Sequence, residues 1–327
     1  MSDTTILQQV QTLEQRQLSE WSLVRDNYAA LEQAQLRELW MGESLVVLQY
    51  NPQRRRSASA RVDAASLKAR PCFLCREHQP VEQEAVEWGG GRYKIQVNPY
   101  PIFPRHLTIS ATEHIPQSLD NPRRIGDMLA LARDLSDYVL FYNGPHCGAS
   151  APDHFHFQAG VKGMLPLCSE VMNNVAWPES DWLEGNQEGF ISYSQRFGRF
   201  MFLIKTSSAV QAELYFARLQ VAMMMTAERT AEPMQNLLCW VDGDDYYLLV
   251  FPRSKHRPDC YGEGEGKFLL SPASTEMGGL WAVASEKDFN ALTEQHVRAL
   301  YDELCIEPAM AVNVIDNYFR TKSLKDE

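Results

Sequence analysis

The alternation of apolar and polar residues changes period several times along the chain and predicts a mixture of helices and strands. Residues 3–40 are rich in Gln, Glu, Leu and Ala, and their apolar side chains recur at helical spacing, which predicts two amphipathic helices before the main fold begins. Short alternating or apolar runs bounded by Asn-Pro or Gly-rich turns predict strands. These runs cover residues 45–50, 93–97, 139–142, 236–241 and 246–251.

Longer segments with helical period predict further helices. One begins at Asn121-Pro122 and continues to about residue 136, and an apolar helix fits Val210–Arg229. Ser285 followed by Asp288 resembles a capping box that opens a helix to about residue 304. A last helix fits residues 308–320. Helices and strands mixed in this way indicate an α+β fold.

The composition is typical of a globular protein. The chain has 327 residues, of which 45% are hydrophobic and 22% charged, and no apolar run approaches the roughly 20 residues that span a bilayer. The start Met1-Ser-Asp-Thr4 lacks the pattern of a secretory signal, and seven irregularly spaced cysteines indicate a reducing compartment rather than a disulfide framework. We therefore expect a cytoplasmic protein.

The net charge of −11 argues against general nucleic-acid binding. An anionic substrate would then need local cations, and one charge about 4 Å away contributes roughly 4 kcal/mol at an effective dielectric near 20. Of the basic residues in the first half, we expect Arg54 and Arg56 to bind substrate. The other candidates are Arg55, Arg61, Arg253, Lys255 and Arg257.

The clearest chemical signal is an alternation in the middle of the chain. His154, His156 and Gln158 are separated by Phe155 and Phe157. On a β-strand alternate residues share one face, so both imidazoles and the amide would face a cleft while the phenyl rings enter the core. Two histidines two apart are common by chance, and a buried histidine with a structural role is the alternative interpretation.

A run of small residues, Gly148-Ala149-Ser150, lies directly before this strand. It can bring backbone N–H groups and the Ser150 hydroxyl close to a bound anion. The alternative is an ordinary tight turn. An imidazole beside a phosphate-binding loop indicates nucleotidyl transfer.

The transferase branch of the histidine-triad superfamily has an active-site signature that this segment resembles, Gly148-x-Ser150-x-x-x-His154-x-His156-x-Gln158. That branch includes galactose-1-phosphate uridylyltransferase, diadenosine tetraphosphate phosphorylase and the GDP-hexose phosphorylases. Segments 70–75, 98–109 and 142–144 are also similar to segments of these enzymes. The resemblance covers about residues 45–165 well and 186–300 loosely.

The resemblance implies two duplicated histidine-triad-like halves, each an antiparallel sheet with packed helices. We therefore expect N-terminal helices in residues 1–40, a catalytic half in 41–185, and a second half with C-terminal helices in 186–327. The second half has no His-x-His. A short echo between Phe103-Pro-Arg-His106 and Phe251-Pro-Arg253 is the one internal repeat in the sequence.

The resemblance also implies the chemistry. His156 would attack the α-phosphorus of a nucleotide and form a covalent nucleotidyl-histidine. Gln158 takes the place of the third histidine of the hydrolase branch, and its amide can donate to a phosphate oxygen but cannot act as a general acid. This favours transfer to phosphate or a sugar phosphate over transfer to water. A polar residue at a strand end is the alternative interpretation of Gln158.

Other residues would hold the substrate. Ser150 and the backbone N–H groups of Gly148 and Ala149 would hold phosphate oxygens as charge builds up in the transition state. Asn98 would bind the nucleoside, although an asparagine before a proline is equally typical of a turn.

A metal site is implied as well. Cys72 and Cys75 form a Cys-x-x-Cys that is similar to the metal-binding segment of the uridylyltransferases, where two histidines complete a zinc site. The matching histidines would be His114 and His154, and two sulfurs with two imidazoles suit tetrahedral zinc of structural type. His78 is a rival ligand. A redox dithiol or two buried thiols are the alternatives.

Together these features predict a nucleotidyltransferase or phosphorylase that acts on a nucleoside diphosphate sugar or a dinucleoside polyphosphate. A nucleotide hydrolase of the same superfamily and a catalytically silent nucleotide-binding regulator are the alternatives. The resemblance implies a homodimer. The base, the sugar, the choice between phosphorolysis and uridylyltransferase-type transfer, and the oligomeric state stay open.

Overall fold

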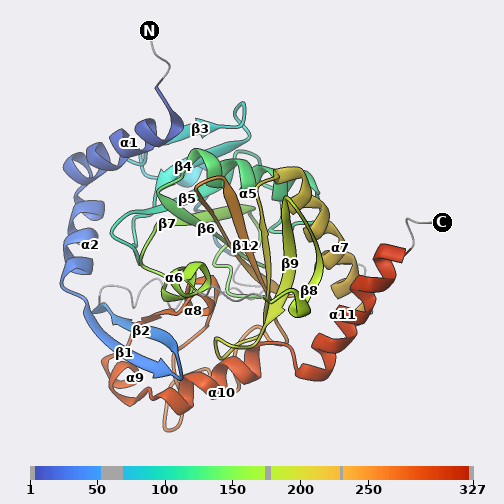
Figure 1. Cartoon of the computed structure of the whole chain (residues 1–327). Helices are drawn as coiled ribbons and strands as arrows, with labels where there is room; N and C mark the ends of the chain where they lie inside the picture. The colour runs from blue at the N-terminus through green and yellow to red at the C-terminus, as the bar shows by residue number, and fades with distance from the viewer. Residues whose placement is uncertain (1–3, 53–68, 174–177, 229–230, 324–327) are drawn as a thin grey trace.

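A ten-stranded antiparallel sheet runs through the molecule, a computed structural model that describes residues 4–52, 69–173, 178–228 and 231–323 (Figure 1). The first half supplies β3 (Val86–Trp88), β4 (Tyr93–Val97), β5 (His106–Ala111), β6 (Tyr138–Asn143) and β7 (His156–Val161). The second half supplies β8 (Trp182–Asn186), β9 (Gly189–Ser194), β10 (Met201–Thr206), β11 (Gln235–Asp242) and β12 (Asp245–Pro252). The order across the sheet is β3-β4-β5-β7-β6-β11-β12-β10-β9-β8.

The strand order shows that one unit occurs twice. In each half three consecutive strands are followed by a helix, α5 (Arg123–Asp134) or α7 (Ala209–Ala227), and then by two strands that return to the sheet. The halves join where β6 pairs with β11, and this ladder ends with Asn143 opposite Asn236. The predicted duplicated α+β fold is therefore confirmed. Its division near residues 40 and 185 stays a prediction.

The two halves differ at the connection that contains the predicted active-site residues. In the first half a loop of residues 144–155 joins β6 to β7, whereas a tight hairpin at Gly243, with φ of 57°, joins β11 to β12. The second half therefore has no counterpart of the segment before His156. The sequence echo is not a trace of the duplication, because Phe103 precedes β5 and Phe251 lies near the end of β12.

A second, three-stranded sheet is built from distant segments. β1 (Gln35–Met41) and β2 (Ser44–Tyr50) form a hairpin, and β13 (Leu280–Val283) pairs parallel to β2. The helix predicted to continue to residue 40 is wrong for residues 35–40. Gly42, with φ of 69°, closes the hairpin, and pairing with β2 outweighs the helical composition of β1.

Helices and the small sheet cover opposite faces of the large sheet. One core packs α5, α7 and α11 (Pro308–Ser323) on one face, with Phe155 and Phe157 buried in it. The other core packs the small sheet with α6 (Pro166–Asn173), α8 (Ser274–Met277), α9 (Glu286–Ala291) and α10 (Glu294–Leu304). α1 (Ile6–Glu20) contacts β3 and β4, and α2 (Ser22–Glu32) follows it.

Apart from residues 35–40, the predicted helices are confirmed, with one further exception. The single helix expected from Ser285 to about residue 304 is two helices, because Thr293 opens α10 and accepts a hydrogen bond from the His296 N–H.

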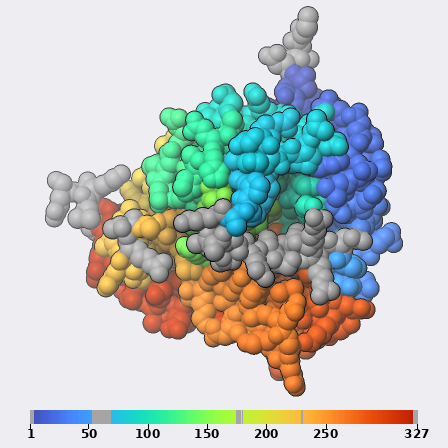
Figure 2. Space-filling model, turned by 180° about the vertical axis from the view of Figure 1, so that it is seen from behind, coloured from blue at the N-terminus to red at the C-terminus, as the bar shows by residue number. Residues whose placement is uncertain are grey.

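Seen from behind, the orange C-terminal segments lie below the first half (Figure 2). None of the helices in the described segments is long and apolar enough to cross a membrane.

Candidate active site and metal site

His156 begins β7, and the backbone holds its ring in one tautomer. Nδ1 lies 2.9 Å from the carbonyl oxygen of His154, so Nδ1 carries the proton and Nε2 carries a lone pair. No described residue hydrogen-bonds Nε2. The side chain is 3% exposed, and burial lowers the pKa of His156 to about 4, so the ring is neutral at pH 7. An oriented, neutral imidazole is a competent nucleophile.

Gln158 has its amide orientation set by the backbone through His106. The Ile102 N–H donates to His106 Nδ1 at 3.1 Å, so the proton of this ring is on Nε2. That nitrogen donates to Gln158 Oε1 at 3.1 Å, which identifies the oxygen end of the amide. The Gln158 NH₂ group has no partner within the described segments, so two donors are available to a ligand.

Asn98 supports the same arrangement. Its Oδ1 accepts from the Tyr100 N–H at 2.9 Å, which turns Nδ2 toward Thr108 Oγ1 at 3.2 Å and Gln158 Oε1 at 3.4 Å. Asn98 is half-buried beside Gln158, and its predicted contact with a nucleoside stays a prediction. His106 is 1% exposed and orients Gln158, a role that the sequence did not indicate.

The loop between β6 and β7 contains the predicted phosphate-binding residues. Gly148 has φ of 91°, and a Cβ there would lie 2.5 Å from the Ala273 Cβ, so no larger residue fits. Ala149 is buried and Ser150 is exposed. Arg70 Nη2 donates to the Ser150 carbonyl at 2.8 Å and brings a guanidinium to the loop. Ser150 and His156 are joined by no hydrogen bond in the described structure.

The second half holds this loop through buried polar groups. Asn236 Nδ2 donates to Asn143 Oδ1 at 2.9 Å and to the Cys147 carbonyl at 2.8 Å. Arg253 Nη1 donates to Asn236 Oδ1. The Ser274 hydroxyl donates to the Tyr142 carbonyl at 2.7 Å, and its N–H donates to Asn143 Oδ1 at 2.9 Å.

Gln117, which the sequence did not single out, contacts the backbone of His156. Its Oε1 accepts from the His156 N–H at 2.8 Å, and its Nε2 donates to the carbonyls of His156 at 3.0 Å and Asn143 at 2.9 Å. Gln117 and Asn236 lie far from His156 in sequence, and no local motif marks them. Only the folded sheet brings them to the active segment.

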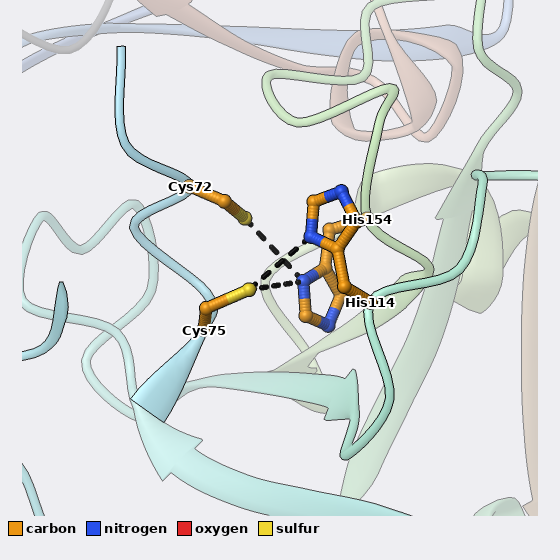
Figure 3. A group of neighbouring side chains, drawn as sticks. All are labelled: Cys72, Cys75, His114 and His154. Atoms are coloured by element: carbon orange, nitrogen blue, oxygen red, sulfur yellow. Dashed lines mark hydrogen bonds between the residues drawn. The ribbon is translucent and has the colours of Figure 1, made fainter. Parts of the chain in front are cut away.

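The four predicted metal ligands converge from three segments (Figure 3). Their ligand atoms all lie within 4.8 Å of one another. Cys72 Sγ is 3.3 Å from His154 Nδ1, and Cys75 Sγ is 3.2 Å from His114 Nδ1. Tetrahedral zinc with Zn–S of about 2.3 Å and Zn–N of about 2.0 Å would separate such atoms by about 3.5 Å. The residues therefore fit a metal ion.

The far sides of both imidazoles support this fit. His154 Nε2 donates to the Ala111 carbonyl at 2.8 Å, which leaves Nδ1 unprotonated toward the two sulfurs. His114 Nε2 lies 3.9 Å from Asp153 Oδ2. His78 groups instead with Cys75 and Glu77, and its Nδ1 lies 3.1 Å from the Cys72 carbonyl. His114 completes the four-ligand cluster. A bound metal would supply structural cross-linking of these segments.

Some predicted residues cannot be placed. Arg54 and Arg56, together with Arg55 and Arg61, lie outside the described residues. Of the other cations that were considered, Arg253 is buried and holds the loop, and Lys255 pairs with Asp259 and Glu303.

Comparison with known proteins agrees with this description. Residues 13–161 match a domain family described as a domain of unknown function, DUF4922. A search of curated proteins gives no match to the sequence. Yeast Ap4A phosphorylase Apa2 in complex with Ap4A is similar with a TM-score of 0.56 and 18% identity, over 90% of this chain and 97% of that chain. The same enzyme in complex with AMP gives a TM-score of 0.54 and 20% identity, over 89% and 96%.

These comparisons establish the fold. The chain has the fold of yeast Ap4A phosphorylase Apa2, which confirms the fold that the resemblance implied. A uridylyltransferase mutant aligns over 66% of this chain and 79% of that chain with 10% identity, but its TM-score of 0.36 carries no weight. Identities of 18–20% leave activity and substrate to be argued from the site itself.

Proposed function

We propose that this protein is a nucleotidyltransferase of phosphorylase or transferase type, with His156 as its covalent nucleophile. The observation that carries the proposal is the His156 ring, which is neutral, buried and fixed by Nδ1–H donation to the His154 carbonyl. This arrangement presents an Nε2 lone pair at the start of β7. The loop of residues 144–155 and the Gln158 amide lie on either side of it in the sequence.

The first step forms a bond from His156 Nε2 to the α-phosphorus and breaks the bond from that phosphorus to the bridging oxygen. The leaving phosphate group departs with the electron pair. The imidazole becomes cationic, and the Nδ1–H bond to the His154 carbonyl strengthens as the charge grows. The Gln158 NH₂ group and the N–H groups of Gly148 and Ala149 donate to phosphate oxygens, where negative charge builds up.

The second step returns the nucleotidyl group to an acceptor. An oxygen of phosphate or of a sugar phosphate attacks phosphorus, and Nε2 leaves as neutral imidazole. Gln158 cannot activate water, because its amide neither accepts nor releases a proton near neutral pH. An already anionic acceptor needs no such activation. We therefore place phosphate or a sugar phosphate as acceptor ahead of water.

The substrate is a dinucleoside polyphosphate or a nucleoside diphosphate sugar. The similarity to an Ap4A phosphorylase, which covers nearly all of both chains, supports the dinucleotide first. We further propose that zinc is the metal at Cys72, Cys75, His114 and His154, and that it anchors the segment before His156. The contacts of Arg54 and Arg56 with substrate, and a homodimer, belong to the same proposal.

The proposal is tested by intact mass and product analysis. Purified protein is incubated with a panel of dinucleoside polyphosphates and nucleotide sugars, without and then with millimolar phosphate. One nucleotidyl unit should appear per chain without acceptor, and phosphate should release it as a nucleoside diphosphate. His156→Ala should bind nucleotide and gain no mass, whereas His146→Ala, an exposed loop histidine, should behave as wild type.

Two outcomes would contradict the proposal. A nucleoside monophosphate as main product at millimolar phosphate would make the protein a hydrolase. Binding without any mass gain across the panel would favour a catalytically silent nucleotide-binding regulator.

A further inference from the structure

The strands that flank the nucleophile separate before they end. β6 and β7 pair from Tyr138↔Val161 as far as Phe141↔Gln158. Beyond that point β6 continues to Asn143 along β11, and β7 begins already at His156 along β5, where Ser110 lies opposite. The backbone groups of Asn143 and His156 that would have faced each other are therefore left without a ladder partner.

The Gln117 amide fills this opening. Its oxygen accepts from the His156 N–H at 2.8 Å, and its nitrogen donates to the His156 carbonyl at 3.0 Å. These two bonds are the pair that a residue of a neighbouring antiparallel strand would make. The second hydrogen of the nitrogen reaches the Asn143 carbonyl at 2.9 Å. Every donor of the amide is used, and Gln117 is 1% exposed.

The backbone that carries the Gln117 side chain is also fixed by hydrogen bonds. The Gln117 N–H donates to the Pro152 carbonyl at 3.2 Å, and the Phe155 N–H donates to the Ile115 carbonyl at 2.7 Å. Residues 115–117 are thereby attached to the segment that enters β7. The side chain therefore bridges the end of β6 and the start of β7 from a backbone that is tied to the segment entering β7.

We propose that Gln117 is a positioning residue for nucleotidyl transfer. Its side-chain amide replaces the peptide group of a neighbouring strand and holds the backbone of His156 at the point where β6 and β7 separate. The same arrangement leaves room there for the loop of residues 144–155. This inference rests on the proposed function and extends it, because Gln117 hydrogen-bonds the backbone of His156 and not its reacting nitrogen. A normal ladder at this position would close the strands together and fix His156 without leaving that opening.

Gln117→Met is the decisive variant, because it keeps the length of the side chain and removes all three hydrogen bonds. Gln17→Met is its matched control. Gln17 is also 1% exposed and holds backbone at both ends, with Nε2 donating to the Glu82 carbonyl at 2.8 Å and Oε1 accepting from the Glu84 N–H at 3.4 Å. It lies in α1, away from β7. Metal content and melting temperature are measured for both variants.

We expect Gln117→Met to lower the single-turnover rate of His156 nucleotidylation about 100-fold at saturating substrate, since a misplacement near 1 Å can have that effect. The nucleotide Kd should change less than about threefold, and Gln17→Met should react as wild type. Gln117→Glu keeps the acceptor for the His156 N–H and loses both donors, so an intermediate loss is expected. It replaces the methionine variant if that variant does not fold.

A tautomer measurement separates this inference from the proposed function. Nitrogen-15 spectra of histidine-labelled protein should show His156 as the Nδ1–H tautomer in wild type, with mixed tautomers in Gln117→Met. If wild type is never nucleotidylated but the His156 tautomer still differs between wild type and Gln117→Met, only the proposed function is overturned. A reactive wild type with a Gln117→Met rate within threefold of it, or an unchanged tautomer in that variant, would overturn the positioning role.

Discussion

Replacing Asn236 with leucine should disable the active loop from the half of the molecule that has no nucleophile. Asn236 is fully buried on β11, opposite Asn143. Its side chain makes three hydrogen bonds, to Asn143 Oδ1, to the Cys147 carbonyl and from Arg253. Leucine has the same number of side-chain heavy atoms with the same branching at Cγ and can make none of these bonds.

The hydrogen bonds that are lost determine the expected decrease in the free energy of unfolding. The two neutral hydrogen bonds are worth about 0.5–1.5 kcal/mol each, and the bond from the charged Arg253 about 1.5–3 kcal/mol. Their sum is about 2.5–6 kcal/mol, and we expect a loss of about 4 kcal/mol in the free energy of unfolding. At roughly 2 °C per kcal/mol for a large chain, the melting temperature should fall by about 8 °C.

Thermal melting and the rate of His156 nucleotidylation are measured together. The rate should fall well below that of wild type at a temperature where both proteins are folded, because the Cys147 carbonyl loses its Asn236 donor and Asn143 Oδ1 loses one of its donors. Gln220→Leu is the control from the same half. It breaks the reciprocal 2.8 Å bonds with Gln235 on the α7 side and touches no loop residue, so it should lower stability and leave the rate unchanged.

An Asn236→Leu protein that melts within about 1 °C of wild type would refute the energetic reasoning. A variant that melts early and still transfers at the normal rate would refute the claim that the second half positions the loop.

Two further changes test the metal site and the loop. Purified protein should contain one zinc per chain by elemental analysis. Cys72→Ser and His114→Ala should have both a lower metal content and a lower melting temperature, because metal binding here contributes to folding. His78→Ala should keep the wild-type metal content and melting temperature. Metal retained in His114→Ala would transfer the ligand role to His78. Gly148→Ala places a Cβ 2.5 Å from Ala273 at φ of 91° and should cut the transfer rate at least tenfold while metal content stays normal; a normal rate would show that the loop geometry is not needed.

The sequence predicted those parts of the molecule that local pattern controls. Alternation placed Phe155 and Phe157 in the core, and Gly-rich or Asn-Pro turns bounded strands that the structure contains. The Cys-x-x-Cys and two distant histidines do come together, as predicted. This prediction came from the resemblance, since spacing alone does not indicate which histidines join the two cysteines. These features depend on residues that are neighbours along the chain or on a known signature.

The features that were missed depend on contacts between distant segments. Residues 35–40 have helical composition and become β1 because β2 pairs with them. Gln117 resembles any polar loop residue until the sheet places it between two strand ends, and Asn236 is one strand residue among many until β11 meets β6. His106 follows a Pro-Arg turn in the sequence, and only the folded sheet buries it against Gln158 at the start of β5. The periodicity of apolar and polar residues does not indicate contacts between segments that are distant in the sequence.

The seam between β6 and β11 has a consequence for motion during turnover. Because a backbone ladder crosses from one half to the other, the halves cannot swing apart about a hinge without breaking its hydrogen bonds. Opening and closing around a substrate must then be carried by loops and side chains on a stiff platform. Mutations that slow product departure should therefore cluster in the connections at the ends of the strands, and small-angle scattering should show the same overall dimensions with and without ligand.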